Sequence, residues 1–258
     1  MPVKATNSAD LTSQLNILAK KRNPSEFEMR LFRKEVEALK GVNADEYYML
    51  LGMLDAVRGD LQSSVENHER ALKLSKDPVD LMNYGLSMRR LGQFLKSQEL
   101  MLLAFEQAPN SPETFNEVCL SLIFSGDFSI IDEAQNRFKR ANPSFDLYDI
   151  DTYANILHIR ECLAKSSIKE SEYTKILSTL SNVLLKYNLS IEDLDVDLSS
   201  FDGVKHVSVF IRVYLDSPEK LFEINERLAD EVISMEDLEC WNRLILNVIN
   251  YDSQDAVA

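Results

Sequence analysis

The composition of the chain indicates a folded, mostly helical and strongly acidic protein. Of its 258 residues, 45% are hydrophobic and 9% aromatic, which excludes an intrinsically disordered chain. Its 42 acidic and 28 basic residues give a net charge of −14, which would repel a phosphate backbone or an anionic membrane surface and disfavours direct binding to either. With only seven glycines and seven prolines there are few helix breaks, so we expect more helix than usual.

The first forty residues predict two helices. Residues 10–22 and 25–40 are separated by the stretch RNPSE, whose asparagine, proline and serine supply a stop and a start. Phe27, Leu31 and Leu39 give the second helix an apolar stripe. We expect this pair to be a degenerate first member of the repeat that follows.

A repeat with a fixed spacing begins near residue 45. Glycines at 59, 92 and 126 are spaced by 33 and 34 residues, a period typical of stacked helical hairpins. Small residues recur seven positions before each of these glycines, at Gly52, Gly85 and Cys119. Prolines lie near the unit boundaries, at Pro78, Pro109 and Pro143. Each unit therefore predicts a helix, a glycine turn and a second helix, with a proline stop.

This pattern resembles the tetratricopeptide repeat, which has small residues at its eighth and twentieth places, a turn glycine near the fifteenth and alanine at the twenty-seventh. Residues 45–110 fit it in two units, with Ser64 and Ser97 at the twentieth place and Ala71 and Ala104 at the twenty-seventh. The third unit, 112–143, departs from it with Ile131 and Phe138, so we expect its second helix to pack irregularly. The resemblance implies a stack of helical hairpins with core repeats at about 45–143.

Another helical pair is predicted at 149–165 and 169–187, on either side of the stretch KSSIKE. It lacks the turn glycine and the terminal proline, and a stack of repeats needs atypical ends. We therefore expect a packing or capping pair that completes a helical domain of residues 1–187.

The apolar period changes from helical to alternating after residue 188. Residues 194–200 and 207–215 alternate apolar with polar residues and predict strands, and Asp202-Gly203 between them predicts a turn slightly longer than the tightest hairpin. Ser217 and Pro218 predict the start of a helix, and 243–250 a last strand. The predicted fold class is thus mostly α, a helical-hairpin stack followed by a small α+β domain, 188–258, with a three-strand sheet and one helix.

The sequence predicts neither a metal site nor an enzyme. The stretch DLDVD, residues 193–197, contains aspartates at alternate positions, as in a calcium loop, but Leu198 and Val204 stand where that loop needs glycine and glutamate. The three histidines and three cysteines lack ligand spacing, and no nucleophile or phosphate-loop motif occurs. We expect no cofactor, and we expect His68 to be a core residue between two helices.

Cysteine usage and hydropathy favour a soluble cytoplasmic protein. The cysteines are odd in number and widely separated, which indicates a reducing compartment. The N-terminal stretch has no apolar region of the kind found in signal peptides, and the longest apolar runs are far shorter than the ~20 residues that span a bilayer.

The resemblance also implies a concave groove lined by the first helix of each repeat. The groove residues that we expect to bind a partner are Met49, Met53, Met82, Asn83, Leu86, Asn116 and Leu120. Methionine suits adaptable apolar recognition, and asparagine can pair with the main chain of an extended peptide. The alternative, that the methionines only fill gaps between helices, stays open. The basic clamp for a terminal carboxylate that is best known in this family is not expected, because Asn83 alone matches it.

Two functions follow as hypotheses. The first is a non-enzymatic scaffold, an adaptor or dedicated chaperone that holds an apolar peptide or helix of another protein in the groove. The second is a regulator or immunity-type inhibitor that binds a basic partner, such as a nuclease, through the acidic surface or the C-terminal sheet. Association into a homo-oligomer stays open.

Overall fold

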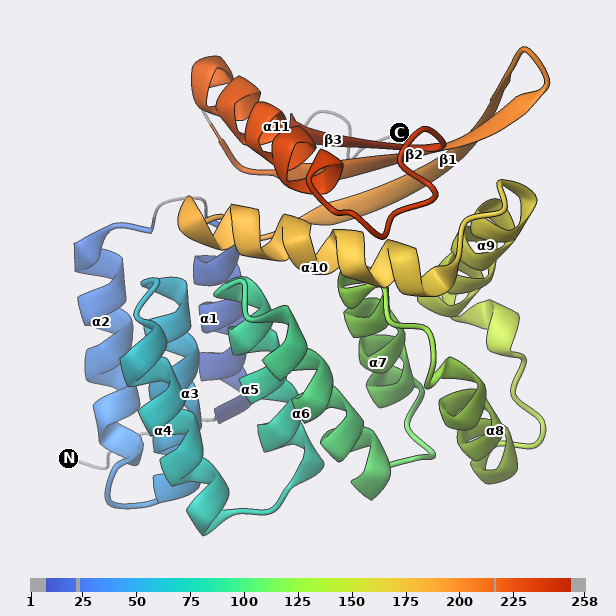
Figure 1. The fold of residues 1–258 in the computed structure, drawn as a ribbon. Helices are drawn as coiled ribbons and strands as arrows, with labels where there is room; N and C mark the ends of the chain where they lie inside the picture. Colours follow the sequence, from blue (N-terminus) through green and yellow to red (C-terminus); the bar gives the residue numbers. More distant parts are fainter. Residues whose placement is uncertain (1–7, 22–23, 216, 252–258) are drawn as a thin grey trace. The chain divides into compact units, whose positions relative to one another are not determined.

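The computed structural model describes residues 8–21, 24–215 and 217–251, with side chains from residue 10 onward (Figure 1). Over these ranges the chain is mostly helical and ends in a three-stranded sheet and a helix, which confirms the expected fold class. Two compact units make up the chain, Met1–Ala108 and Pro109–Ala258. The boundary expected at residue 187 lies inside the second unit.

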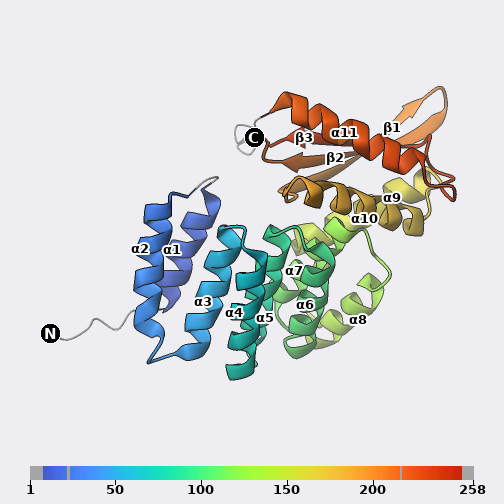
Figure 2. The same ribbon diagram turned by 60° about the vertical axis from the view of Figure 1, so that its left-hand side comes forward.

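The first unit consists of three antiparallel helical hairpins (Figures 1 and 2). They are α1 (Ser8–Lys20) with α2 (Glu26–Val36, extended by the short 3-10 helix Glu37–Leu39), α3 (Ala44–Val57) with α4 (Leu61–Leu74), and α5 (Pro78–Arg90) with α6 (Phe94–Gln107). The first helices of the hairpins pack in a row, because α3 contacts both α1 and α5. The predicted stop at Asn23 lies outside the described residues.

Side-chain caps explain where several of these helices begin. Ser25 and Glu28 form a capping box at the start of α2, and the Asp60 carboxylate accepts a hydrogen bond from the backbone N–H of Ser63 at the start of α4. Pro78 is the first residue of α5 and follows the cap residue Asp77, so it starts a helix and is not the stop that the sequence suggested.

Small residues let the two helices of each hairpin approach closely, as predicted. A Cβ added to Gly52 would lie 2.6 Å from Cδ2 of His68, and one added to Gly85 would lie 2.7 Å from Cε of Met101. The Ser64 hydroxyl also donates a buried hydrogen bond of 2.8 Å to the Gly52 carbonyl. The α3–α4 hairpin is thus joined by backbone contact as well as by apolar packing.

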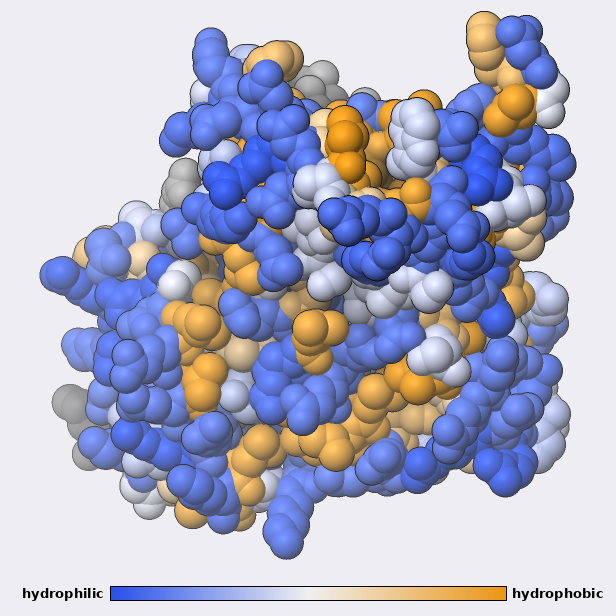
Figure 3. Space-filling model, in the orientation of Figure 1, coloured by the Kyte–Doolittle hydropathy of each residue, from blue (hydrophilic) through white to orange (hydrophobic). Residues whose placement is uncertain are grey.

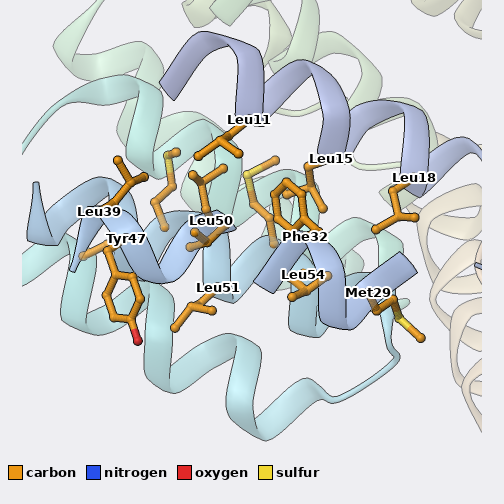
Figure 4. Close-up of a cluster of buried hydrophobic side chains, with 14 residues drawn as sticks. Leu11, Leu15, Leu18, Met29, Phe32, Leu39, Tyr47, Leu50, Leu51 and Leu54 are labelled. Atoms are coloured by element: carbon orange, nitrogen blue, oxygen red, sulfur yellow. The ribbon is translucent and has the colours of Figure 1, made fainter. Parts of the chain in front are cut away.

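The core of the first unit lies where α1, α2 and α3 meet (Figure 4). Leu11 and Leu15 from α1, Phe32 from α2, and Leu50 and Leu54 from α3 are all buried there. A smaller cluster around Tyr84 and Met88 joins α5 to α6. The degenerate first pair therefore contributes to the same core as the regular repeats.

The second unit contains four helices followed by the sheet. The helices are α7 (Pro112–Ser125), α8 (Ile131–Ala141), α9 (Asp151–Lys165), which follows a short 3-10 helix (Leu147–Asp149), and α10 (Glu170–Lys186). Helix α7 contacts α9 more extensively than it contacts α8. The ring of Phe138 on α8 nevertheless stacks on that of Phe115 on α7, with 4.7 Å between the ring centroids. This agrees with the irregular packing predicted for the second helix of the third repeat.

The sheet combines an antiparallel hairpin with a parallel strand. β1 (Asp193–Phe201) pairs antiparallel with β2 (Val204–Val213), and β2 pairs parallel with β3 (Leu244–Asn250) after the crossover helix α11 (Pro218–Ile233). Asp202 and Gly203, at φ +49° and +79°, form a two-residue turn. The slightly longer connection predicted from the sequence is wrong, because the strand pairing reaches Phe201 and Val204.

All three turn glycines adopt the left-handed conformation that their spacing predicts. Gly59, Gly92 and Gly126 have φ of +79°, +72° and +68°. Gly126 also lies against α10, where an added Cβ would be 2.9 Å from Leu177 Cδ1, whereas nothing lies within 4 Å at Gly59.

Replacing these glycines by alanine should therefore give unequal losses of stability. For Gly59→Ala we expect a loss of about 1–2 kcal/mol, since only the left-handed backbone is penalised. For Gly126→Ala we expect about 2–4 kcal/mol, because the methyl group also collides with α10. Urea unfolding of both variants measures the difference. Equal losses would show that Leu177 yields without cost.

No helix within the described ranges has the length and apolar character needed to cross a membrane.

Candidate functional site

The seven residues predicted to line a groove belong to α3, α5 and α7 and divide between the two units. Met49 and Met53 are on α3, Met82, Asn83 and Leu86 on α5, and Asn116 and Leu120 on α7. The structure gives these three sets different surroundings.

On α3, the two methionines are core residues. Met49 is 6% exposed and Met53 9%, and both belong to the cluster that contains Leu11 and Leu15 of α1. Because α1 packs on the face of α3 that the repeat pattern assigns to the groove, these side chains are covered within their own unit. For Met49 and Met53 the structure therefore favours the gap-filling alternative.

On α5, the predicted residues form a partly exposed apolar row. Val79 is 54% exposed, and Met82, Asn83 and Leu86 are half-buried. Val79 and Leu86 are each three or four positions from Met82 and Asn83, so the four residues lie on one face of the helix. The Asn83 side-chain amide donates to the Met49 sulfur at 3.0 Å, which fixes Asn83 toward α3 at the border of the row.

On α7, one of the two predicted residues, Asn116, contacts α9. The Thr152 hydroxyl donates to the Asn116 side-chain oxygen at 2.9 Å, and Leu120 is half-buried. Asn116 is thus engaged within its own unit.

Isolated exposed leucines occur on the second helices of the first unit as well, at Leu61 and Leu74 on α4 and Leu95 and Leu103 on α6. Figure 3 shows separate apolar areas over α4 and α6 among hydrophilic residues. Single exposed apolar side chains are normal on a protein surface. The row on α5 differs because its members are consecutive on one helix face.

A polar cleft that the sequence did not predict lies between α2, α3 and α4. Its volume is about 350 Å³, and its charged lining residues are Arg33, Lys40, Asp55, Arg58, Asp60, Glu66 and Arg70. Asp55 is only 6% exposed and accepts a 2.8 Å hydrogen bond from the Asn67 amide. Burial raises the pKa of the Asp55 carboxyl, against the lowering effect of that hydrogen bond. The signal in the sequence was an aspartate within the apolar stretch MLLGMLDAV.

Most charges in this cleft already have partners. Arg58 pairs with Glu26 at 3.1 Å and Arg70 with Glu66 at 3.6 Å, while Asp60 caps α4. Arg70 also lies 5.7 Å from the ring centroid of Tyr48. We infer from these contacts that the charged residues of the cleft help to hold the first two hairpins together.

His68 is a core histidine, as predicted. It is 1% exposed and stacks on Tyr84 at 4.7 Å. The Ser87 hydroxyl donates to the Asn83 carbonyl, so it accepts from Nε2–H of His68, 2.8 Å away. Burial lowers the pKa of His68 to about 3, which keeps the ring neutral at physiological pH.

The expectation that no cysteine lies at ligand spacing from a histidine is wrong for His158 and Cys162, which are four residues apart on one face of α9. Cys162 Sγ lies 3.6 Å from Nε2 of His158. That nitrogen is also 3.2 Å from the Val196 carbonyl, which can only accept, so it carries the proton and cannot serve as a base toward the thiol. Burial also raises the pKa of Cys162, which disfavours the reactive thiolate.

The other thiols are equally unreactive. Burial raises the pKa of Cys119 to about 12 and that of Cys240 to about 11. Among residues 8–21, 24–215 and 217–251, no group of three or more histidine, cysteine, aspartate and glutamate side chains is arranged to hold a metal ion.

Fold and surface together define a class, a protein of stacked helical hairpins that ends in a small α+β part. No protein-family model matches the chain, and no solved structure matches it.

Proposed function

We propose that the protein is a non-enzymatic scaffold, an adaptor or dedicated chaperone, which holds an apolar peptide or helix of another protein on α5. The proposal is supported by the hairpin architecture of the first unit, which resembles a tetratricopeptide stack in its turns and close helix contacts. In such a stack the first helix of each hairpin offers its free face to ligands.

The row Val79, Met82, Asn83 and Leu86 is the observation that carries the proposal. From Val79 to Leu86, seven residue steps, a helix rises about 10 Å, enough to contact about three residues of an extended peptide. Its apolar members keep part of their surface exposed, although Met82 also packs against the cluster around Tyr84 and Met88. Methionine at its centre can adjust to different side chains.

The energy available from this row is moderate. Burying the exposed parts of three apolar side chains contributes at most about 1 kcal/mol each. Micromolar binding needs about 8 kcal/mol, so the partner must add main-chain hydrogen bonds or further contacts. We expect the Asn83 side-chain oxygen, which the Met49 contact does not use, to accept one of these.

Introducing charge into the row should abolish binding without unfolding the protein. In the double variant Met82→Glu, Leu86→Glu, we expect at least about a tenfold loss of affinity, because two carboxylates would meet an apolar ligand. The ligands would be peptides selected by display against the full chain, with affinity measured by fluorescence anisotropy. We expect selected peptides to carry apolar residues at regular spacing.

Leu95→Glu is the matched control, since Leu95 is 71% exposed on α6 and lies outside the row. This variant should bind the selected peptides like the parent protein. If Leu95→Glu and the double variant lose binding equally, or neither does, the row on α5 is not the site. Circular dichroism checks that both variants remain folded.

A further inference from the structure

The sheet of the second unit has one covered and one open face. Alternate residues of the strands are buried on the covered face: Leu194, Val196, Val207, Val209, Ile211, Val213 and Val248. Helix α11 contacts β3, and α9 contacts β1 and β2. Residues of α9 also border a cavity together with Asp195, Phe210 and Arg212 of the opposite face. Side chains of the opposite face are all half-buried or exposed.

The open face combines an apolar centre with an acidic margin. Strand register places Asp195 beside Phe210, and Ser208 beside Ile245, which is 46% exposed. Asp193, Asp195 and Asp197 follow one another along β1. This face therefore offers apolar contact next to a column of carboxylates.

The apolar surface continues to the end of the β1–β2 hairpin. Phe201 and Val204 flank the turn on the same face and are 73% and 47% exposed. In Figures 1 and 2 this turn projects beyond the other elements of its unit. A protruding aromatic side chain is a typical anchor in protein interfaces.

Main-chain groups at one position on each edge of the sheet are engaged by neighbouring helices, so we expect a ligand to use the face of the sheet and not to add a fourth strand. The Asn225 side chain bonds both the N–H and the carbonyl of Val248 on β3, each at 2.8 Å. His158 binds the Val196 carbonyl on β1. Edge groups held in this way are not free to pair with another strand.

The charges on the open face select the kind of partner. Arg212 forms ion pairs with Asp193 and Asp195, and no described residue forms one with Asp197. A second copy of the chain would set aspartates against the same acidic face, in a protein of net charge −14. A basic partner would gain from both features.

We propose that the open face of the sheet is a second interaction surface, which docks a segment of another protein that carries lysine or arginine beside apolar side chains. Asp197 receives the cation, while Phe210, Ile245 and Phe201 receive the apolar groups. This surface uses different residues from the row on α5. It names the residues that would act if a basic partner binds through the C-terminal sheet.

Short labelled peptides provide the test. One alternates lysine with leucine, one glutamate with leucine and one lysine with serine, and each is titrated against the full chain by fluorescence anisotropy at low and high salt. We expect the lysine–leucine peptide to bind at least about tenfold tighter than the other two, because it alone satisfies both parts of the face. Binding of the lysine–serine peptide at equal strength would instead show general attraction to an acidic protein and overturn the proposal.

Variants locate the binding on this face. Ile245→Ser and Asp197→Lys should each weaken the lysine–leucine peptide several-fold, and Asp197→Lys should also reduce the salt dependence. The matched controls are Phe222→Ser and Asp230→Lys on α11, both at exposed positions, which should bind like the parent. Unchanged binding in the face variants, or a dimer in sedimentation that Ile245→Ser dissociates, would overturn the proposal.

Discussion

Stability of the first unit should fall steeply as the pH drops below about 6.5, because His68 must be neutral in the folded state. Its pKa is lowered to about 3 by burial, from 6.5 in the absence of that environment. Between these values the unfolded chain binds the proton and the folded chain does not, so the free energy of unfolding decreases by about 1.4 kcal/mol per pH unit. Above pH 6.5 this contribution is fully present.

The structural reason is that no described acidic side chain pairs with the His68 ring, so a positive charge on the ring would not be balanced. His68 is packed between Gly52 and the ring of Tyr84, and among the described residues its polar contact is the Ser87 hydroxyl. Protonation would bury a cation without a counter-charge, which is strongly unfavourable. Two-dimensional NMR of the histidine rings should show His68 unprotonated while the protein remains folded.

His68→Phe is the control that isolates this effect from the carboxylates, which also titrate in acid. Phenylalanine keeps the ring stack and has no proton to bind, so the free energy of unfolding should depend less on pH between about 6.5 and 4. Urea unfolding at several pH values measures both proteins. Parallel pH profiles would mean that His68 is protonated in the folded state.

The local signals of the repeat were sufficient to predict the first unit. A turn glycine needs a left-handed backbone, and the 33-residue spacing of Gly59 and Gly92 placed two such turns correctly. The small residue at Gly52 and the larger His68 also follow from the resemblance, because one makes room for the other. These features depend on residues within one hairpin, which a sequence pattern can contain.

Which first-helix residues are exposed was harder to predict. Core residues and the residues expected to line a groove recur with the same helical period, so the sequence pattern does not separate them. Met53 and Leu86 occupy equivalent places in the repeat, yet Met53 is buried and Leu86 is half-buried. The difference arises from α1, which covers α3 in the first unit. Such burial depends on contacts between segments far apart in the sequence. Because the first helical pair does not follow the repeat pattern, the sequence did not indicate which residues of α3 it would cover.

Long-range polar contacts in the second unit could not be predicted from the sequence either. Arg243 donates to the carbonyls of Ser166 and Ser167 at 3.0 and 3.1 Å, and so ties the start of β3 to the end of α9. These partners are more than seventy positions apart. In an acidic chain, one arginine or glutamate among many gives no sign that it is structural.

Glu172 should be the most sensitive of these contacts, and Glu172→Ala should destabilise the second unit by about 3–5 kcal/mol. The side chain is 7% exposed and accepts hydrogen bonds from the backbone N–H groups of Glu239 at 2.6 Å and Cys240 at 3.2 Å. Burial opposes its ionisation, but these bonds and one from the Lys169 N–H outweigh it, so the pKa of Glu172 is lowered.

Removing this carboxylate leaves backbone donors without a partner, at the loop that leads into β3. Trp241, the single tryptophan of the chain, lies in that loop directly after Cys240 and reports its unfolding by fluorescence. We expect Glu172→Gln to lose less, since its amide oxygen keeps one acceptor, and exposed Glu161→Ala on α9 to match the parent protein. Hydrogen exchange at Glu239 and Cys240 should accelerate in Glu172→Ala alone. If all three variants unfold at the same urea concentration, the loop is held by the Arg243 contacts and Glu172 adds nothing to them.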